Sequence, residues 1–173
     1  MGRFQAGLFA CLFASLLTAC SSGGGETPTE PTRPESPPAV VPATQVTTAI
    51  VTLTNEERVR AGLGPLRAEA RLTHAAQLQA EQNARLSRLE HVLPEAMYPR
   101  PEDRLAAAGY PWQAYGENIA YGYPDASTVV TGWMNSSGHR ANILGASFTE
   151  IGVGHAFDSA GRPYYAQVFG RPR

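Results

Sequence analysis

The stretch Thr131–Leu144, TGWMNSSGHRANIL, carries the pattern that decides the fold. It combines a large apolar anchor, Trp133, with a run of small polar residues and a histidine, His139, set between glycine and arginine. Small polar residues favour helix caps and turns, whereas tryptophan favours burial. The stretch therefore predicts the end of one helix, a turn and the start of another, with His139 at the mouth of a groove.

The first 20 residues have the features of an export signal. Arg3 supplies positive charge, and the apolar run from Phe4 to Ala19 is too short to span a bilayer comfortably. The run ends in LTAC, and a Ser/Gly-rich sequence follows Cys20 at once. We therefore expect a lipoprotein signal over residues 1–20 and a lipid anchor on the Cys20 thiol. An ordinary secretory peptide cleaved near Ala19 is the alternative.

Cysteine usage, charge and composition narrow the class of protein. Cys11 would leave with the signal and Cys20 would be modified, so we expect no disulfide in the mature chain. The net charge of −1 gives no argument for nucleic acid as a partner. Residues 21–48 are rich in Pro, Thr, Ser and Gly, which predicts a disordered tether. Residues 49–173 then form one domain.

Within this domain the pattern predicts helices first and a β-hairpin last. Helical spacing and caps predict helices that begin at the Thr54–Glu57 capping box and over 68–89, 101–108 and 125–134. Alternation predicts strands over 149–156 and 164–169 around a turn at 158–162, with 49–53 as a third candidate and 110–123 as a tyrosine-rich loop. This order favours an α+β fold in which helices cover an antiparallel sheet.

Three titratable residues stand out at the ends of predicted elements: His91, Glu117 and His139. Two imidazoles and a carboxylate can hold a divalent cation such as Zn²⁺ or Mg²⁺, or form an acid–base pair in which the carboxylate orients a ring. The structural alternative is that Glu117 caps a turn and both histidines bond to the backbone. No nucleophile elbow, phosphate loop or zinc-protease motif is present, so no catalytic residue is assigned on a motif and no cofactor is required.

Four blocks in this order resemble the CAP superfamily, or SCP domain, which includes cysteine-rich secretory proteins, venom antigens and pathogenesis-related proteins. They are LTNEER at 53–58, GENIA at 116–120, WMNSSGHR at 133–140, and IGVG at 151–154 leading to YAQVFG at 165–170. The match spans about Thr48 to Gly170 and is closest to the bacterial branch without disulfides. The resemblance implies a three-layer α-β-α sandwich with a central antiparallel sheet. It also implies an open cleft lined by two histidines and two acids.

The resemblance makes His91 and His139 the two histidines and Glu117 the first acid. The second acid aligns with Ser136, so this chain lacks it, which weakens a cation site and a paired-carboxylate mechanism. We expect a membrane-anchored protein of the bacterial cell envelope, periplasmic or on the outer surface, whose cleft binds a lipid, a glycan or an envelope protein without catalysis. A metal-dependent or acid–base hydrolase and a purely structural lipoprotein are the alternatives.

Overall fold

The computed structural model describes residues 43–173 of the chain. Those residues form five helices and four strands: α1 Ala43–Arg60, β1 Arg67–Ala68, α2 Ala70–Leu86, α3 Pro101–Ala107, β2 Trp112–Tyr121, α4 Ala126–Asn135, α5 Ser137–Ile143, β3 Glu150–Phe157 and β4 Pro163–Pro172. The predicted signal, Cys20 and the first part of the predicted tether lie outside the described residues.

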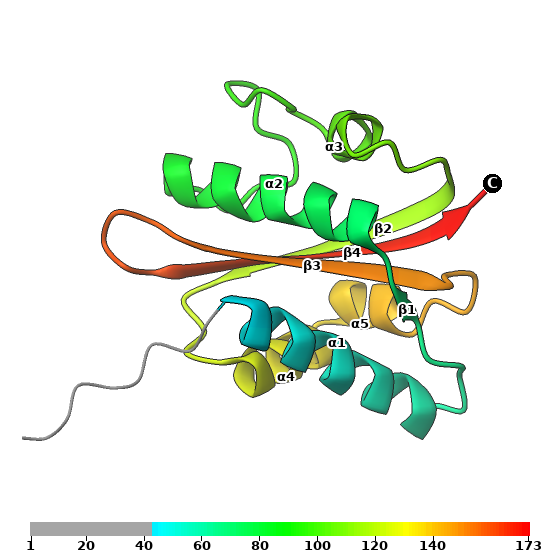
Figure 1. Cartoon of the computed structure of the whole chain (residues 1–173). Coiled ribbons are helices and arrows are strands. Elements are labelled where there is room, and N and C mark those ends of the chain that lie inside the picture. Colours follow the sequence, from blue (N-terminus) through cyan, green and yellow to red (C-terminus); the bar gives the residue numbers. More distant parts are fainter. Residues whose placement is uncertain (1–42) are drawn as a thin grey trace, which may run out of the picture. The chain divides into compact units, whose positions relative to one another are not determined.

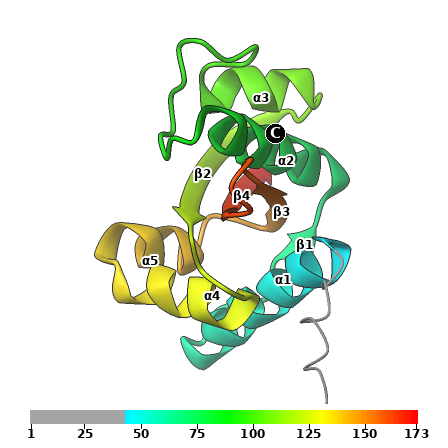
Figure 2. The ribbon, with the colours of Figure 1, turned by 90° about the vertical axis from the view of Figure 1, so that its left-hand side faces the viewer.

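The elements form three layers with the sheet in the middle. Helices α2 and α3 cover one face, and α1, α4 and α5 cover the other (Figure 1), an arrangement that is seen nearly end-on in Figure 2. The strand order is β1-β3-β4-β2. The α+β sandwich is therefore confirmed. The sheet is mixed rather than wholly antiparallel, because the two-residue β1 runs parallel to β3.

Helix α1 begins earlier than the sequence predicts. Residues 43–48, assigned to the tether, are helical, and the strand predicted over 49–53 is wrong because this segment is part of α1. Thr54 does not cap a helix but lies buried inside α1, where its hydroxyl accepts a hydrogen bond from Nε2 of Gln167 at 2.7 Å. Burial of Ile50 and Thr54 against the rest of the domain outweighs the local capping pattern.

Helix α2 lies directly on β3 because its inner face carries small side chains. A Cβ atom added at Gly152 would lie 2.1 Å from the carbonyl carbon of Leu72, and one at Gly154 would lie 2.3 Å from the carbonyl oxygen of Ala76. Glycine in a strand permits this close approach of two backbones. The backbone of α2 therefore packs closely against β3.

The tyrosine-rich loop predicted over 110–123 is wrong, because most of it is strand β2. Glu117 and Asn118 pair with Val168 and Gln167 of β4 in an antiparallel ladder. The aromatic residues of this segment suit a pleated, half-buried strand. Pairing with β4 supplies the backbone hydrogen bonds, which the β-propensity of the segment alone does not predict. Glu117 therefore projects from a sheet rather than from a loop.

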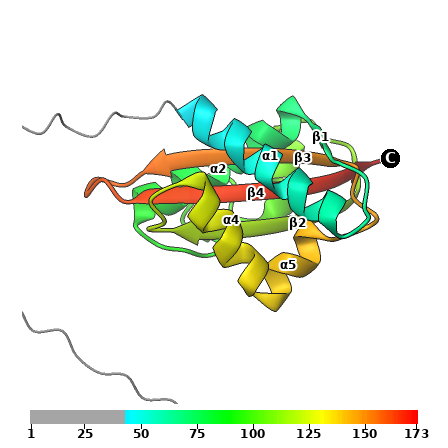
Figure 3. The same cartoon turned by 90° about the horizontal axis from the view of Figure 1, so that it is seen from below.

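The opposite face carries the larger core, and Figure 3 shows α1 beside α4 on this side of the sheet. Asp125 caps α4 as predicted, since its Oδ1 accepts a hydrogen bond from the Thr128 N–H at 2.8 Å. Ser136 ends α4 and precedes α5, so the helix–turn–helix predicted for 131–144 is confirmed. Within residues 43–173, none of the helices combines the length and the apolar character needed to cross a bilayer.

Candidate functional site

His91 and Glu117 meet at one wall of a cleft. His91 lies in the loop after α2 with its side chain half exposed, whereas the Glu117 side chain rises from β2 and is buried. Nδ1 of His91 lies 2.8 Å from Oε1 of Glu117. A carboxylate that accepts the Nδ1–H bond fixes the ring and leaves Nε2 as the unprotonated nitrogen of the neutral imidazole.

A buried arginine completes this wall. Arg104 of α3 is 1% exposed, and its Nη2 donates to Oε1 and Oε2 of Glu117 at 3.1 and 2.9 Å. The same nitrogen donates to the His91 carbonyl at 3.1 Å, and Nη1 donates to the Tyr98 carbonyl at 3.2 Å. Arg104 therefore ties α3, β2 and the loop that carries His91 into one network.

Two amides of α2 clamp the residue before His91. Nε2 of Gln79 donates to the Glu90 carbonyl at 2.7 Å, and the Glu90 N–H donates to Oδ1 of Asn83 at 3.2 Å. Both amide side chains are fully buried. Sequence reasoning missed this clamp and Arg104, since isolated polar residues on helices usually face solvent. The one available signal was Asn83, which falls on the inner face of the predicted helix, where a polar group needs partners.

His139 lies on the opposite wall, in the first turn of α5. Its carbonyl accepts a hydrogen bond from Nδ2 of Asn118 at 3.1 Å, and Nδ2 of Asn142 donates to the Glu117 carbonyl at 3.2 Å. Both asparagines thus satisfy backbone carbonyl groups. Burial lowers the pKa of His139, and charge on His91 lowers it further.

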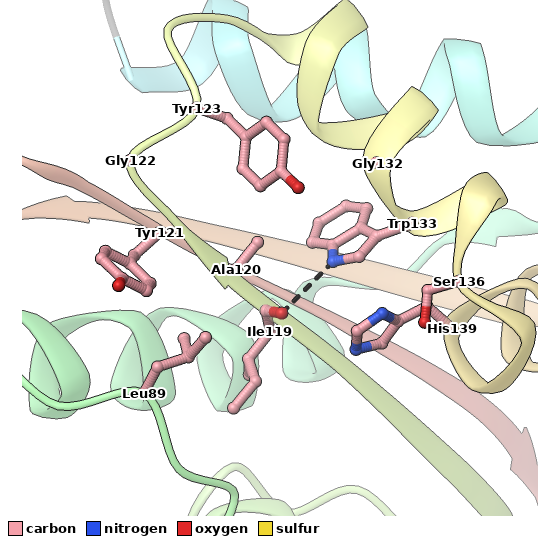
Figure 4. Close-up of a pocket in the computed structure, with 10 residues that line it drawn as sticks. All are labelled: Leu89, Ile119, Ala120, Tyr121, Gly122, Tyr123, Gly132, Trp133, Ser136 and His139. Atoms are coloured by element: carbon pink, nitrogen blue, oxygen red, sulfur yellow. Dashed lines mark hydrogen bonds between the residues drawn. The ribbon is translucent and has the colours of Figure 1, made fainter.

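An apolar pocket of about 500 Å³ adjoins His139. Its floor is β2, with Leu89 on one side and the α4–α5 turn on the other, and Tyr121 lies at the end away from His139 (Figure 4). Nε1 of Trp133 donates to the Ile119 carbonyl at 3.3 Å, so the indole presents an apolar surface with its polar atom satisfied.

Tyr123 fits against α4 beside this pocket because residue 132 is glycine. A Cβ atom at Gly132 would lie 2.5 Å from the Tyr123 hydroxyl oxygen. Sequence reasoning missed this pocket, because the pocket forms only where β2 and α4 lie side by side.

The family profile described as "Cysteine-rich secretory protein family" (CAP) matches residues 51–169, most of the chain. The chain belongs to the CAP family. This CAP domain has the fold and the order of blocks that the sequence resemblance implies, and the family is one of extracellular proteins.

Relatives and solved structures place the domain among bacterial CAP proteins. The chain is 40% identical to uncharacterized protein YkwD of Bacillus subtilis over 106 residues, 61% of this chain and 40% of that protein. It is 37% identical to the uncharacterized membrane protein YlbC of the same organism over 120 residues, 69% of this chain and 33% of that protein. The chain thus spans less than half the length of both relatives.

Solved structures from other bacteria share the fold. An extracellular protein containing an SCP domain from Bacillus anthracis superposes with a TM-score of 0.69 at 29% identity, covering 77% of this chain and 44% of that one. An outer surface protein from Borrelia burgdorferi superposes with a TM-score of 0.69 at 18% identity, covering 77% of this chain and 97% of that one. At this identity the match shows only that the two proteins have a similar fold.

The Glu117 carboxylate of the cleft already has a cationic partner. Both oxygens of Glu117 accept hydrogen bonds from Arg104, whose positive charge opposes a divalent ion at the same carboxylate. In the described part of the chain, no three His, Cys, Asp or Glu side chains gather to hold a metal ion. Binding of Zn²⁺ or Mg²⁺ by His91, Glu117 and His139 stays a prediction that a titration decides.

Proposed function

We propose that this chain is an exported CAP protein of the bacterial cell envelope, anchored by a lipid on Cys20, whose cleft binds an amphipathic ligand such as a single-chain lipid. One observation carries the binding proposal. The apolar pocket of about 500 Å³ and the His139 imidazole belong to the same cleft.

The apolar end suits the body of such a ligand. Leu89 is 37% exposed and Tyr121 is 48% exposed, so both offer apolar surface that a ligand would remove from water. Burial of apolar surface stabilises by about 25 cal/mol per Å². Tyr121 also stacks on Tyr164 with ring centroids 5.6 Å apart, which supports its ring from behind.

The polar end suits the head of the ligand. His139 has a lowered pKa and favours the neutral form near pH 7, in which it offers one donor and one acceptor. His91 adds a second imidazole whose Nδ1 is already engaged by Glu117. A neutral or polar head group would fit here better than a bare cation, because Arg104 already neutralises the carboxylate.

The test is binding of lysophosphatidylglycerol, below its micelle concentration, by calorimetry on the full chain. Replacing Tyr121→Ser should weaken binding about tenfold, because apolar contact is lost. Tyr98→Ser is the matched control, since Tyr98 lies outside this pocket, and it should leave the affinity unchanged. Equal effects of both substitutions, or binding that Tyr121→Ser leaves intact, would refute the lipid-cleft proposal. A soluble glycan or an envelope peptide titrated in its place tests the other ligand classes.

The lipid anchor rests on the sequence around Cys20 and on the extracellular character of the family. Acyl chains stabilise membrane attachment by about 0.8 kcal/mol per buried methylene group. Mass spectrometry of the chain from expressing cells should find a diacylglycerol on Cys20, and Cys20→Ser should move the protein out of the membrane fraction. An unmodified Cys20 in the membrane fraction would show that something else holds the protein there.

The His91–Glu117 hydrogen bond favours a second candidate, an acid–base hydrolase. A carboxylate-oriented imidazole is the arrangement that general acid–base catalysis uses. Esterase and peptidase assays on the parent, His91→Gln and His139→Gln would test it. Turnover lost in both variants, with unchanged thermal midpoints, supports a hydrolase, and turnover retained in both excludes these residues. A parallel Zn²⁺ titration of the three proteins tests the metal prediction.

A further inference from the structure

A second groove lies outside the cleft, between α2 and the connection from α2 to α3. Figure 1 shows this connection on the side of α2 that faces away from the sheet. The outer groove has a volume of about 600 Å³, within the range of about 300–1,000 Å³ that is typical of small-molecule sites. Its lining includes Glu81, Gln82 and Arg85 of α2, and Glu95, Met97 and Tyr98 of the connection.

Hydrogen bonds hold the connection that forms the outer wall of this groove. The Leu93 N–H donates to the Pro99 carbonyl at 3.0 Å, and the Ala96 N–H donates to the Leu93 carbonyl at 2.9 Å. Nη1 of the buried Arg104 donates to the Tyr98 and Pro99 carbonyls at 3.2 and 3.4 Å. A site that is formed in advance loses less conformational entropy when a ligand binds. The outer groove therefore has the rigidity that a binding site needs.

Gln82 lines the groove with an amide that the protein leaves unsatisfied. The residue is 7% exposed, and within residues 43–173 its Oε1 atom has no hydrogen-bond partner. A buried polar atom without a partner costs free energy, and native proteins keep few of them. Rotation about the last torsion of a glutamine exchanges its oxygen and nitrogen, so either atom can face the groove. Gln82 therefore has hydrogen-bonding capacity that a ligand in the groove can use.

Charges of both signs occur together in the outer groove. Glu81 and Arg85 are exposed and lie one turn apart on α2 with opposite charges. On the other wall, Oε1 of Glu95 lies 3.1 Å from Nη1 of Arg88 in an exposed ion pair. A site for a polyanion or a phosphate group concentrates positive charge instead. The groove therefore suits an uncharged ligand with many hydrogen-bonding groups, to which carboxylates offer acceptors and the guanidinium offers donors.

Two side chains of the connection add apolar surface to these polar groups. Met97 is 79% exposed, and Tyr98 is half-buried with its side chain in the lining of the groove. Tyrosine combines an apolar ring with a polar hydroxyl, and the thioether of methionine adapts to the shape of its partner. A sugar ring has the matching construction, with a face of C–H groups and a rim of hydroxyl groups.

We propose that the outer groove binds a neutral oligosaccharide, at a second site that is separate from the cleft. The amide of Gln82 and the guanidinium of Arg85 hydrogen-bond the hydroxyl groups, and the ring of Tyr98 packs on the C–H face of a sugar ring. A lipid chain suits the apolar pocket of the cleft, whereas the charged side chains of the outer groove would lose water without gaining partners around such a chain.

The experiment titrates the full chain in detergent with cellotetraose and with tetra-N-acetylchitotetraose, two neutral oligosaccharides, by calorimetry. Gln82→Leu should weaken binding about tenfold, because a hydrogen bond to the ligand is lost. The same substitution should leave the thermal midpoint unchanged or raise it, since it removes an unsatisfied buried polar group. Gln113→Leu, at an exposed glutamine on β2, is the matched control and should leave the affinity unchanged. A lower midpoint with unchanged affinity would show that Gln82 serves stability alone and would overturn the proposal.

A pair of tyrosine variants separates this site from the cleft. Tyr98→Ser should weaken oligosaccharide binding about tenfold and leave the affinity for lysophosphatidylglycerol unchanged, whereas Tyr121→Ser should do the reverse. In methyl NMR, saturating oligosaccharide should shift the signal of Met97 and leave that of Met134 on α4 in place. Binding of neither oligosaccharide at millimolar concentration, or binding that Tyr121→Ser weakens and Tyr98→Ser does not, would overturn the proposal. A failure of lipid binding alone would refute the lipid-cleft proposal and leave this one standing.

Discussion

The two walls of the cleft hold their histidines in different ways. On the α2–α3 side, Glu117 fixes the ring of His91, and Arg104 fixes both Glu117 and the His91 carbonyl. On the α4–α5 side, the ring of His139 makes no hydrogen bond within residues 43–173, and only its carbonyl is held, by Asn118. The fold thus fixes one imidazole and leaves the other available beside an apolar pocket, which suits recognition of an amphipathic molecule.

Disrupting the α2–α3 side of the cleft, where His91 is fixed, should have the largest effect on the stability of the protein. Arg104→Leu leaves the buried Glu117 carboxylate without its cation and removes a hydrogen bond from three carbonyls, so we expect a loss of about 3–5 kcal/mol in the free energy of unfolding. Urea denaturation measures it. Arg140→Leu, an exposed arginine on α5, is the control and should stay within about 0.5 kcal/mol of the parent. Similar losses in the two variants would mean that the Arg104 network does not hold the wall.

Two glycine substitutions compare the walls at the level of packing. Gly154→Ala forces a methyl group into the backbone of α2 and should cost about 2 kcal/mol of unfolding free energy. Gly138→Ala, in α5 of the free wall, meets no atom within 4 Å and should leave the stability unchanged or slightly higher. Thermal unfolding of both variants checks this. A destabilised Gly138→Ala variant would show that the α4–α5 side of the cleft is packed as tightly as the α2–α3 side.

His155, which lies outside the cleft, should make the stability of the protein depend on pH. Burial lowers the pKa of His155 below its ordinary value of 6.5, so the unfolded chain binds more protons below that pH. Stability should therefore be full above about pH 6.5 and fall as the pH is lowered through and below that value. His139 contributes with the same sign. His155→Phe should flatten the fall in thermal midpoint between pH 7 and 5, and an unchanged slope would show that this buried ring does not cause it.

The smallest expected effect is a change in the pKa of His139 when the charge on His91 is removed. Burial is the main cause of the lowered pKa of His139, and charge on His91 is the second. Removing that charge with His91→Ala should raise the pKa of His139, though burial keeps it below the ordinary value. Proton NMR titration of the His139 ring measures the shift. A pKa that stays the same or falls would mean that the two rings do not interact across the cleft.

Local patterns predicted much of the fold. The helix–turn–helix at 131–144 and the final hairpin follow from periodicity, caps and turn residues. Two segments did not follow such rules. Burial of Thr54 converts an apparent cap into a helix interior, and pairing with β4 converts an apparent loop into β2. Both outcomes depend on residues more than 40 positions away along the chain, which a local pattern does not contain.

The sequence likewise predicted some residues of the candidate site and missed others. His91, Glu117 and His139 were identified from the sequence, and the structure brings His91 and Glu117 into contact. Arg104 and Gln79 were missed because their roles depend on tertiary burial, which gives a polar side chain on a helix a partner from another element. The apolar pocket was missed for a similar reason, since Leu89, Tyr121 and Trp133 come from three separate elements.

The most direct test of the central claim is photo-crosslinking with a single-chain lipid that carries a diazirine in the middle of its acyl chain. Val59 and Met97 are 60% and 79% exposed, more than Leu89 or Tyr121, so they report unspecific labelling of exposed apolar side chains. We predict adducts on Leu89 and Tyr121, which decrease when unlabelled lipid competes. Adducts mainly on Val59 and Met97, without competition, would contradict the proposal that the cleft binds an amphipathic ligand.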